Sequence, residues 1–218
     1  MLLQGLIAQV GIHKIPIIIA DGGSTDGTRK IIQHYSSYKV LDITLIDGGT
    51  PSEGRNKGLE LVKTDGVLFL DADIKFWKDD TLLRSWELLN DGYGLVSCKL
   101  KGYDRDWKIN FGFWVWNWVH KALIKWYPFA VGGFFMTRTQ HFAALGGWDE
   151  RVDNSGDFLA SQYFRPDEFK VLHHPVGQDG RRIRKIGWWG MVSHLIKNFW
   201  KFHQEGKSWF YKKSRYWG

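Results

Sequence analysis

The sequence lacks the marks of secreted and of membrane-spanning proteins. Its 218 residues contain one cysteine, Cys98, so no disulfide can form within the chain, and this fits a reducing compartment. No basic, apolar and small-residue regions follow one another at the start as in a secretory signal. No apolar run reaches the length of about 18 residues that would span a bilayer. We therefore expect a cytoplasmic protein that is not integral to a membrane.

Acidic residues are scarce at one end of the chain. The whole sequence has a formal charge of +7, but residues 181–218 contain ten Lys or Arg and a single acid, Glu205. That segment alone carries +9, which leaves residues 1–180 at −2. The uneven charge predicts two parts, a folded body at 1–180 and a basic helical extension at 181–218.

The apolar pattern alternates between helix-like and strand-like stretches. Helices are predicted at 2–10, from near 28, and at 53–63, 81–90 and 155–164, and strands at 15–20, 40–46, 67–70, 94–100 and 130–137. Strands separated by helices favour parallel pairing with right-handed crossovers. We expect an α/β fold with an open, doubly wound, mostly parallel sheet flanked by helices.

One predicted strand ends abruptly in two carboxylates. The apolar run 67–70 leads directly into Asp71 and Asp73, and open α/β sheets bind ligands beyond the carboxyl ends of their strands. Carboxylate oxygens suit Mg²⁺ or Mn²⁺, which complete their coordination with phosphate oxygens and water. The alternative is a pair of solvated acids at a strand end.

Tryptophan is rare in the first part of the chain and abundant in the rest. Of 13 Trp residues only Trp77 and Trp86 precede position 100. Residues 103–128 alternate aromatic with polar side chains, which predicts a helix with one aromatic face. This pattern is typical of a membrane-interface or sugar-binding surface, although core packing accounts for some of the aromatic residues.

Six short motifs occur in one order, and they connect these features to a family. They are Asp21-Gly-Gly-Ser-Thr-Asp-Gly-Thr28, Gly54-Arg-Asn-Lys-Gly58, Asp71-Ala-Asp73, Gly132-Gly-Phe-Phe135, Gly146-Gly-Trp-Asp-Glu150 and Gly156-Asp157. In this order and spacing the chain resembles family 2 inverting glycosyltransferases of the GT-A fold, from its start to about residue 175. The resemblance implies transfer of a sugar from a nucleotide-diphosphate sugar to a glycan or a lipid-linked acceptor. A UDP-sugar is the first choice of donor.

Three residues match positions that bind the donor in this family. Asp21 matches an acid that accepts hydrogen bonds from the base or the ribose, and Gly23 lies in the loop that approaches the base. Arg55 matches an arginine near the nucleotide, where its guanidinium could bind uracil or the diphosphate. Without the resemblance, Arg55 could equally pair with Glu53 or Glu60 on its own helix.

The resemblance also assigns the metal site. Asp73 is the first choice as the ligand of Mn²⁺ or Mg²⁺, and Asp71 contacts the ribose, the ion or a water bound to it. His173 is a further candidate ligand, although a histidine near a strand end is more often structural. The prediction requires Asp21, Asp71 and Asp73 to line one site.

The catalytic and acceptor positions lie further along the chain. Asp157 matches the general base, which takes the proton from the acceptor hydroxyl as that hydroxyl attacks the anomeric carbon. Many members have Glu before this acid, where this sequence has Gly156. Trp148 and Asp149 match a region that shapes the acceptor pocket, where an indole can stack on a sugar and a carboxylate can accept from hydroxyls.

The start of the chain departs from the family pattern. Family members open with a strand that lies in the middle of the sheet, whereas this sequence begins at the helix that follows it. Without that strand we expect two strand edges to have no partner.

The basic extension leaves alternatives open. Residues 181–218 combine cations with apolar residues at helical spacing, which predicts an amphipathic helix in peripheral contact with an anionic membrane, or else packed on the body. A non-catalytic protein that binds membrane or nucleic acid through this segment is one alternative to the enzyme, although we expect no nucleic-acid partner. A nucleotidyltransferase is another, but the Gly-rich phosphate loop with a lysine near the start is missing.

Overall fold

The computed structural model describes residues 2–37, 41–103, 106–130, 133–152 and 155–211. The strands are β1 (Pro16–Asp21), β2 (Asp42–Asp47), β3 (Gly66–Leu70), β4 (Lys75–Phe76), β5 (Leu95–Gly102), β6 (Phe134–Arg138) and β7 (Phe169–Gln178). The α-helices are α1 (Leu2–Ile7), α2 (Thr28–Ser37), α3 (Pro51–Leu61), α4 (Thr81–Asn90), α5 (Trp107–Leu123), α6 (Thr139–Ala144), α7 (Gly156–Ser161) and α8 (Arg181–Glu205). Short 3-10 helices are η1 (Ile12–Lys14), η2 (Pro166–Glu168) and η3 (Gly206–Tyr211). Most of the predicted elements are confirmed, with shorter bounds for α1, α5, β6 and α7, whereas β4, α6 and β7 were not predicted.

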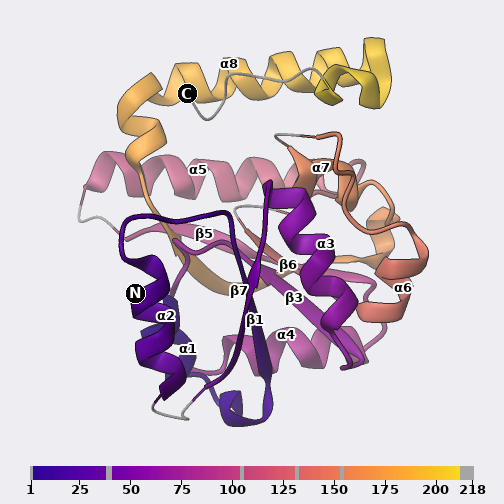
Figure 1. The fold of residues 1–218 in the computed structure, drawn as a ribbon. Helices are drawn as coiled ribbons and strands as arrows, with labels where there is room; N and C mark the ends of the chain where they lie inside the picture. Colours follow the sequence, from indigo (N-terminus) through magenta and orange to yellow (C-terminus); the bar gives the residue numbers. More distant parts are fainter. Residues whose placement is uncertain (1, 38–40, 104–105, 131–132, 153–154, 212–218) are drawn as a thin grey trace.

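The strands form two sheets with helices packed around them (Figure 1). β1 and β2 pair in parallel, from Pro16 with Asp42 to Asp21 with Asp47. The second sheet has the order β3-β6-β5-β7-β4, in which only β5 and β7 are parallel. The α/β class is confirmed, but the second sheet is mixed and not mostly parallel. The sequence pattern misses this because β6 returns antiparallel between β3 and β5.

One edge each of β1 and β3 carries no strand partner among the described residues. β1 pairs with β2 alone, and β3 pairs with β6 alone. The carboxyl ends of β1 and β3 still lie in the same region. Helix α3 packs on β1, and its Arg55 donates a hydrogen bond to the residue that follows β3. Helix α3 thus connects the two sheets at the carboxyl ends of β1 and β3.

The core contains a compact aromatic cluster beneath the strand ends. Phe135 and Phe142 are fully buried, and Trp148 is 2% exposed. Phe69 meets all three rings at centroid distances between 5.0 and 6.1 Å. Tilted and edge-to-face contacts of this kind stabilise a core beyond the burial of apolar area. The cluster packs beneath the carboxyl end of β3, where Asp71 follows the strand.

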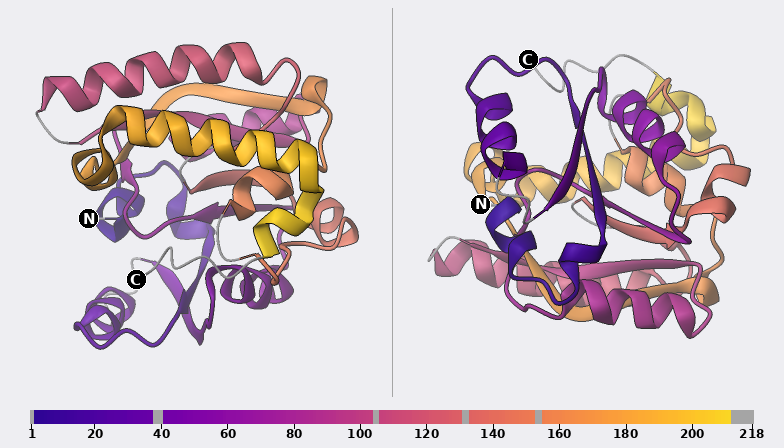
Figure 2. Two further views of the ribbon diagram at one scale, coloured as in Figure 1. Left: turned by 90° about the horizontal axis from the view of Figure 1, so that it is seen from above. Right: turned by 60° about the horizontal axis from the view of Figure 1, so that its bottom comes forward.

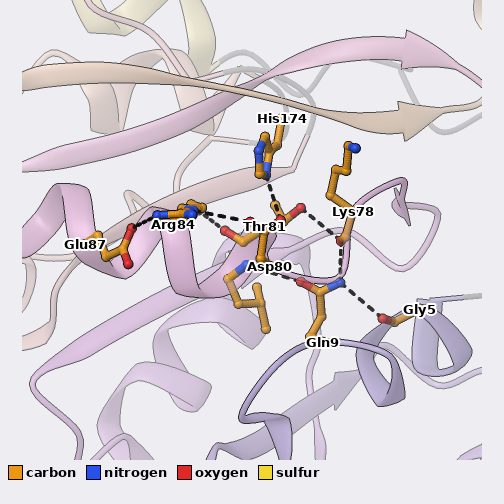
Figure 3. A network of polar contacts seen from close by, with 10 residues as sticks. Gly5, Gln9, Lys78, Asp80, Thr81, Arg84, Glu87 and His174 are labelled. Carbon is orange, nitrogen blue, oxygen red and sulfur yellow. Dashed lines mark hydrogen bonds and ion pairs between the residues drawn. The ribbon is translucent and has the colours of Figure 1, made fainter.

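A buried polar network fixes α1 against α4 (Figure 3). Gln9 is 3% exposed, and its amide donates to the carbonyl of Lys78 at 2.7 Å and accepts from the backbone N–H of Leu82 at 3.2 Å. A buried amide is costly unless it is hydrogen-bonded, and here both of its ends have partners. In the same region His174 Nδ1 lies 3.3 Å from Asp80 Oδ1. His174 is thereby part of the structural packing of β7 on α4.

Helices α5 and α8 run beside one another on one side of the molecule (Figures 1 and 2). The Trp188 ring packs directly over Gly112, and Tyr127 meets Phe199 at a centroid distance of 5.1 Å. α8 is interrupted at Gly187, whose φ of 69° and ψ of 169° are not helical. No helix within the described ranges combines the length and the apolar character needed to cross a bilayer.

Candidate active site

Arg55 joins two acids that come from distant parts of the chain. Its Nη2 donates to Asp71 Oδ1 at 2.8 Å and its Nη1 donates to Asp157 Oδ1 at 3.0 Å. The guanidinium also lies over the Trp148 ring, 4.4 Å from its centroid. Only 20% of the Arg55 side chain is exposed. One cation therefore holds the residue after β3 and the second residue of α7 in a single site.

The start of α3 positions Arg55. Thr50 is the N-cap, its hydroxyl accepts from the Glu53 N–H, and the Glu53 carboxylate accepts from the Thr50 N–H at 2.9 Å. This reciprocal pair satisfies two backbone donors at the helix start, and Pro51 suits the first helical position. Glu53 is thus occupied with the helix cap and does not pair with Arg55. The functional interpretation of Arg55 gains support over the surface ion pair.

Asp157 is a partly buried carboxyl with one charged partner. Its side chain is 26% exposed. Burial raises the pKa of Asp157 and the negative charge of Asp71 adds to this, whereas Arg55 acts in the opposite direction. A carboxyl whose pKa is raised is a better proton acceptor than an ordinary aspartate, provided that it is ionised at the working pH. Asp157 therefore has the chemistry of a general base.

Asp71 owes its place to a glycine with left-handed backbone. Gly133 has φ of 73°, and a Cβ at this position would overlap the Asp71 carboxyl group. The Gly133 carbonyl also accepts the Asp71 N–H at 3.1 Å. Only glycine adopts this conformation without strain and leaves room for the carboxyl group. The other glycine of this motif, Gly132, lies outside the described residues.

Asp73 lies close enough to Asp71 for the two charges to repel. Burial and the Asp71 carboxylate raise the pKa of Asp73, while Arg181 opposes that shift from a distance of 3.4 Å. Two hard oxygen donors that repel one another fit a divalent cation, because the ion would relieve the repulsion. The residues present therefore fit Mg²⁺ or Mn²⁺ held by Asp73 and Asp71.

His173 does not join these acids, which corrects its assignment as a metal ligand. Its Nδ1 lies 3.0 Å from Lys99 Nζ, and the positive charge of Lys99 lowers the pKa of His173. Throughout the described part of the chain, no three His, Cys, Asp or Glu side chains gather as a metal-binding group. A histidine beside a lysine ammonium is a poor site for a further cation because the charges repel.

Asp21 belongs to a separate network at the end of β1. Its carboxylate accepts from the Ser24 hydroxyl at 2.5 Å and from Arg29 Nε at 2.5 Å, and Arg29 also pairs with Asp47 at 2.6 Å. These hydrogen bonds lower the pKa of Asp21 to about 2. Among the described residues, no contact links Asp21 to Asp71, so the expectation that they line one site is not supported by a contact. Its role toward a base or ribose remains a prediction.

The loop after β1 contains a glycine with positive φ and an aspartate that binds the start of α2. Gly23 is exposed with φ of 93°, in a conformation that favours glycine. Asp26 accepts from the Thr28 N–H at 3.1 Å and from its hydroxyl at 2.6 Å. Asp26 thus satisfies a backbone N–H at the start of α2. Gly23 presents open backbone to solvent, as a loop that approaches a ligand requires.

Trp148 is a core residue. Phe69 packs against the indole from one direction and Arg55 lies over it from another. This placement corrects the sugar-stacking interpretation, because a ring that is 2% exposed offers no open face to a sugar. The ring instead supports the Arg55 guanidinium through a cation–π contact.

Asp149 lines a pocket of about 450 Å³ beside this site. Its carboxylate pairs with Arg151 at 2.8 Å and accepts from the Tyr211 hydroxyl at 3.0 Å, and these partners lower the pKa of Asp149 to about 2. Lys207 and Tyr163 line the same pocket. The pocket is polar and is shared between the body and the C-terminal extension, so it suits a hydroxyl-rich ligand.

Two residues of the site were not identified from the sequence. Asn56 donates to the carbonyl of Trp148 at 2.8 Å and accepts from its N–H at 2.9 Å, which fixes the turn next to Asp149. Arg181 approaches Asp73 from the basic segment. Asn56 lies inside the motif Gly54–Gly58, so the sequence contained a signal for it. No local pattern relates Arg181 to Asp73, which lies far away in the sequence.

Comparison with known proteins places this site in a family. Residues 2–145 match the description "Glycosyl transferase family 2". The chain belongs to this family. Among curated proteins it is similar to a putative teichuronic acid biosynthesis glycosyltransferase, TuaG, of Bacillus subtilis (strain 168), at 39% identity over 91 residues. This match covers 37% of the present chain and 36% of TuaG.

Solved structures of glycosyl transferases share the fold of this family 2 chain. The mannosyltransferase PcManGT of Pyrobaculum calidifontis, solved with GDP-Man and Mn²⁺, has a TM-score of 0.70 at 21% identity over 94% of this chain and 60% of its own. TarS of S. aureus, solved with UDP-GlcNAc, has a TM-score of 0.59 at 18% identity over 78% and 50%. These matches cover 60% of the PcManGT chain and 50% of residues 1–349 of TarS, so the present chain spans only part of the length of each. At such identities the likeness establishes the GT-A-like fold.

Proposed function

We propose that this protein transfers a sugar from a nucleotide-diphosphate sugar to a hydroxyl of a glycan or a lipid-linked acceptor, with inversion at the anomeric carbon. The observation that carries the proposal is the Arg55 contact with both Asp71 and Asp157. It brings a carboxylate suited to a metal-bound diphosphate next to a carboxyl suited to general-base work. Family membership and the nucleotide sugars in the similar structures support the same chemistry.

In this proposal each side chain has one task. Asp73 and Asp71 hold a divalent cation, which offsets the negative charge that develops on the departing nucleoside diphosphate. Arg55 binds the diphosphate or the base with fixed donors, and the rigid Trp148 ring keeps its guanidinium in place. Asp157 takes the proton of the acceptor hydroxyl as that oxygen attacks opposite the leaving group. The attack is direct, so inversion follows.

The donor and acceptor sides are proposed from different observations. Asp21 and Gly23 form the loop after β1, which we propose contacts the nucleotide base and ribose of a UDP-sugar. The pocket around Asp149 is proposed to receive acceptor hydroxyls. The basic segment 181–218, whose Arg181 lies 3.4 Å from Asp73, is proposed to contact a membrane surface peripherally.

Thermal unfolding with candidate donors tests the proposal. UDP-sugars and GDP-sugars are each added with and without Mn²⁺. A donor that binds only the folded chain raises the melting temperature by about 5–10 °C at about a hundred times its Kd. We expect one donor to do so only with Mn²⁺, and Asp73→Ala to abolish the dependence on Mn²⁺. A chain that no donor stabilises in any metal condition would instead be a binding protein without transferase activity.

A further inference from the structure

Helix α5 presents a row of large aromatic side chains to solvent. Trp107, Phe111, Trp114 and Trp118 are between 56% and 71% exposed. Their spacing of four, three and four residues places them within about 60° of one another around the helix. Three of the four rings follow one another in contact, with centroids 5.7 Å apart for Phe111 and Trp114 and 6.1 Å for Trp114 and Trp118. We name these four residues the α5 aromatic stripe.

The stripe is not needed to hold α5 on the body. The opposite face of the helix is buried, with Ile109 at 3%, Phe113 at 6% and His120 at 1% exposed. Asn117, on a side of the helix, exchanges two hydrogen bonds with the backbone of Leu100 on β5, at 3.0 and 2.8 Å. The helix therefore has a complete packing face and a second apolar face that covers nothing in the described structure.

The charged side chains within α5 have one sign, and the acid Asp106 caps the start of the helix. Lys108 and Lys121 flank the exposed aromatic rings, with the Lys121 ammonium 5.9 Å from the Trp118 ring centroid and the Lys108 ammonium 6.0 Å from that of Trp107. The sequence contains no Asp or Glu between Asp106 and Asp149. Exposed aromatic rings on a helix that itself carries lysines and no acids are typical of helices that lie in an anionic membrane surface.

We propose that the α5 aromatic stripe inserts into the headgroup region of an anionic lipid bilayer, with α5 lying in the plane of the surface. Indole rings prefer this region because they have an apolar body and a polar N–H. The lysines then meet lipid phosphates on either side of the rings. This surface is distinct from the basic segment 181–218 and goes beyond the proposed transferase activity.

The chain after α5 connects the stripe to Asp157. Ala130 N–H donates to the Ser161 hydroxyl at 2.8 Å, and that hydroxyl donates to the Asp157 carbonyl at 2.6 Å. Pro128 also accepts from the Gln162 amide at 2.7 Å. A bilayer bound at α5 would thereby stand in a fixed relation to the helix that carries the proposed base. This last step rests on the proposed function, whereas membrane binding does not.

Vesicle co-sedimentation of the full chain tests the proposal without donor or acceptor. The vesicles are pure phosphatidylcholine or an equal mixture of phosphatidylcholine and phosphatidylglycerol. We expect binding to the mixed vesicles, weakened by salt, and Trp114→Ser with Trp118→Ser to weaken it by about tenfold or more. The matched control is Ile31→Ser on α2, because Ile31 is as exposed as Phe111, at 57%. Equal binding of the double variant and the control overturns the proposal.

A reporter on the stripe separates insertion from loss of folding. Cys98 is fully buried, so a cysteine introduced at Trp118 or at Ile31 can be labelled selectively with a polarity-sensitive dye. We expect a blue shift on mixed vesicles at position 118 and none at position 31. Unchanged emission at both positions overturns the proposal. The proposal is also overturned if substitution of the stripe changes the oligomeric state of the protein in solution but leaves vesicle binding intact. The stripe would then contact a second copy of the chain.

Discussion

Arg55 on α3 and Asp157 on α7 stand 102 positions apart in the sequence, and they meet through an ion pair of 3.0 Å. The same guanidinium holds Asp71, so the proposed base and a proposed metal ligand share one cation. A donor diphosphate that binds Arg55 would compete with this pairing and leave Asp157 less neutralised. Its carboxylate would then be more basic when the donor is present than when it is absent.

Replacement of Arg55 should move the acidic limb of the pH profile. Burial raises the pKa of Asp157 and Arg55 lowers it, so Arg55→Gln raises this pKa further. A base works in its ionised form, and a higher pKa means that activity falls at a higher pH. The measurement is kcat/KM against pH at saturating Mn²⁺. Arg84→Gln, which removes an exposed α4 arginine, should leave the limb in place, and a downward shift in Arg55→Gln contradicts the argument.

Asp157→Asn should separate donor binding from transfer. The amide keeps an oxygen that accepts from Arg55 but cannot take a proton. We expect the Mn²⁺-dependent thermal stabilisation by the donor to persist while turnover falls by about 10²–10⁴-fold. Asp167→Asn, at a surface acid paired with Arg165, serves as the control. Undiminished turnover in Asp157→Asn would remove it as the base.

Gly133→Ala should disturb the metal site through Asp71. The added methyl group overlaps the Asp71 carboxyl, so that carboxyl must leave its place. Positive φ strains alanine at any site by about 1–2 kcal/mol, which is why Gly92→Ala is the matched control. Gly92 has φ of 100° and open space around its Cβ position. Both variants should lose stability, but only Gly133→Ala should also lose the thermal response to Mn²⁺ with donor; retention of that response would disprove the role of Gly133.

Phe135→Ala should destabilise the aromatic cluster under the site. The side chain is fully buried and contacts Phe69, Phe142 and Trp148, so truncation leaves a cavity and should cost about 3–5 kcal/mol in the free energy of unfolding. Phe111→Ala, at 57% exposed, should change it by less than about 0.5 kcal/mol. Urea titrations give both values, and similar losses in the two variants would argue against the cluster as the core of the site.

The ends of strands could be predicted from the sequence because an apolar run and the polar residue that ends it are local features. Asp71 follows the apolar run of β3, and Asp21 ends the apolar run of β1, although Pro16 and Ala20 of β1 are exposed. The capping pattern from Thr50 to Glu53 likewise set the start of α3. These features depend on a few consecutive residues, so the order of elements and the acids at their ends could be predicted.

The pairing of strands was harder to predict because it depends on distant segments. β6 lies between β3 and β5 and runs against both, which no local period records. The burial of Trp148 has the same cause, since its neighbours Phe69 and Phe135 come from two other segments. A tryptophan after a glycine pair looks alike in sequence whether it faces a sugar or a core.

The sequence by itself determined the family, the element order and the chemical types at the strand ends, because motifs and periodicity are properties of short stretches. Only the tertiary structure decided which of those groups meet. In the folded chain, Arg55 forms ion pairs with Asp71 and Asp157. Arg181 pairs with Asp73, and His173 lies beside Lys99. Periodicity specifies the face of a helix or strand that is buried, whereas the identity of the facing residue follows from the packing of whole elements.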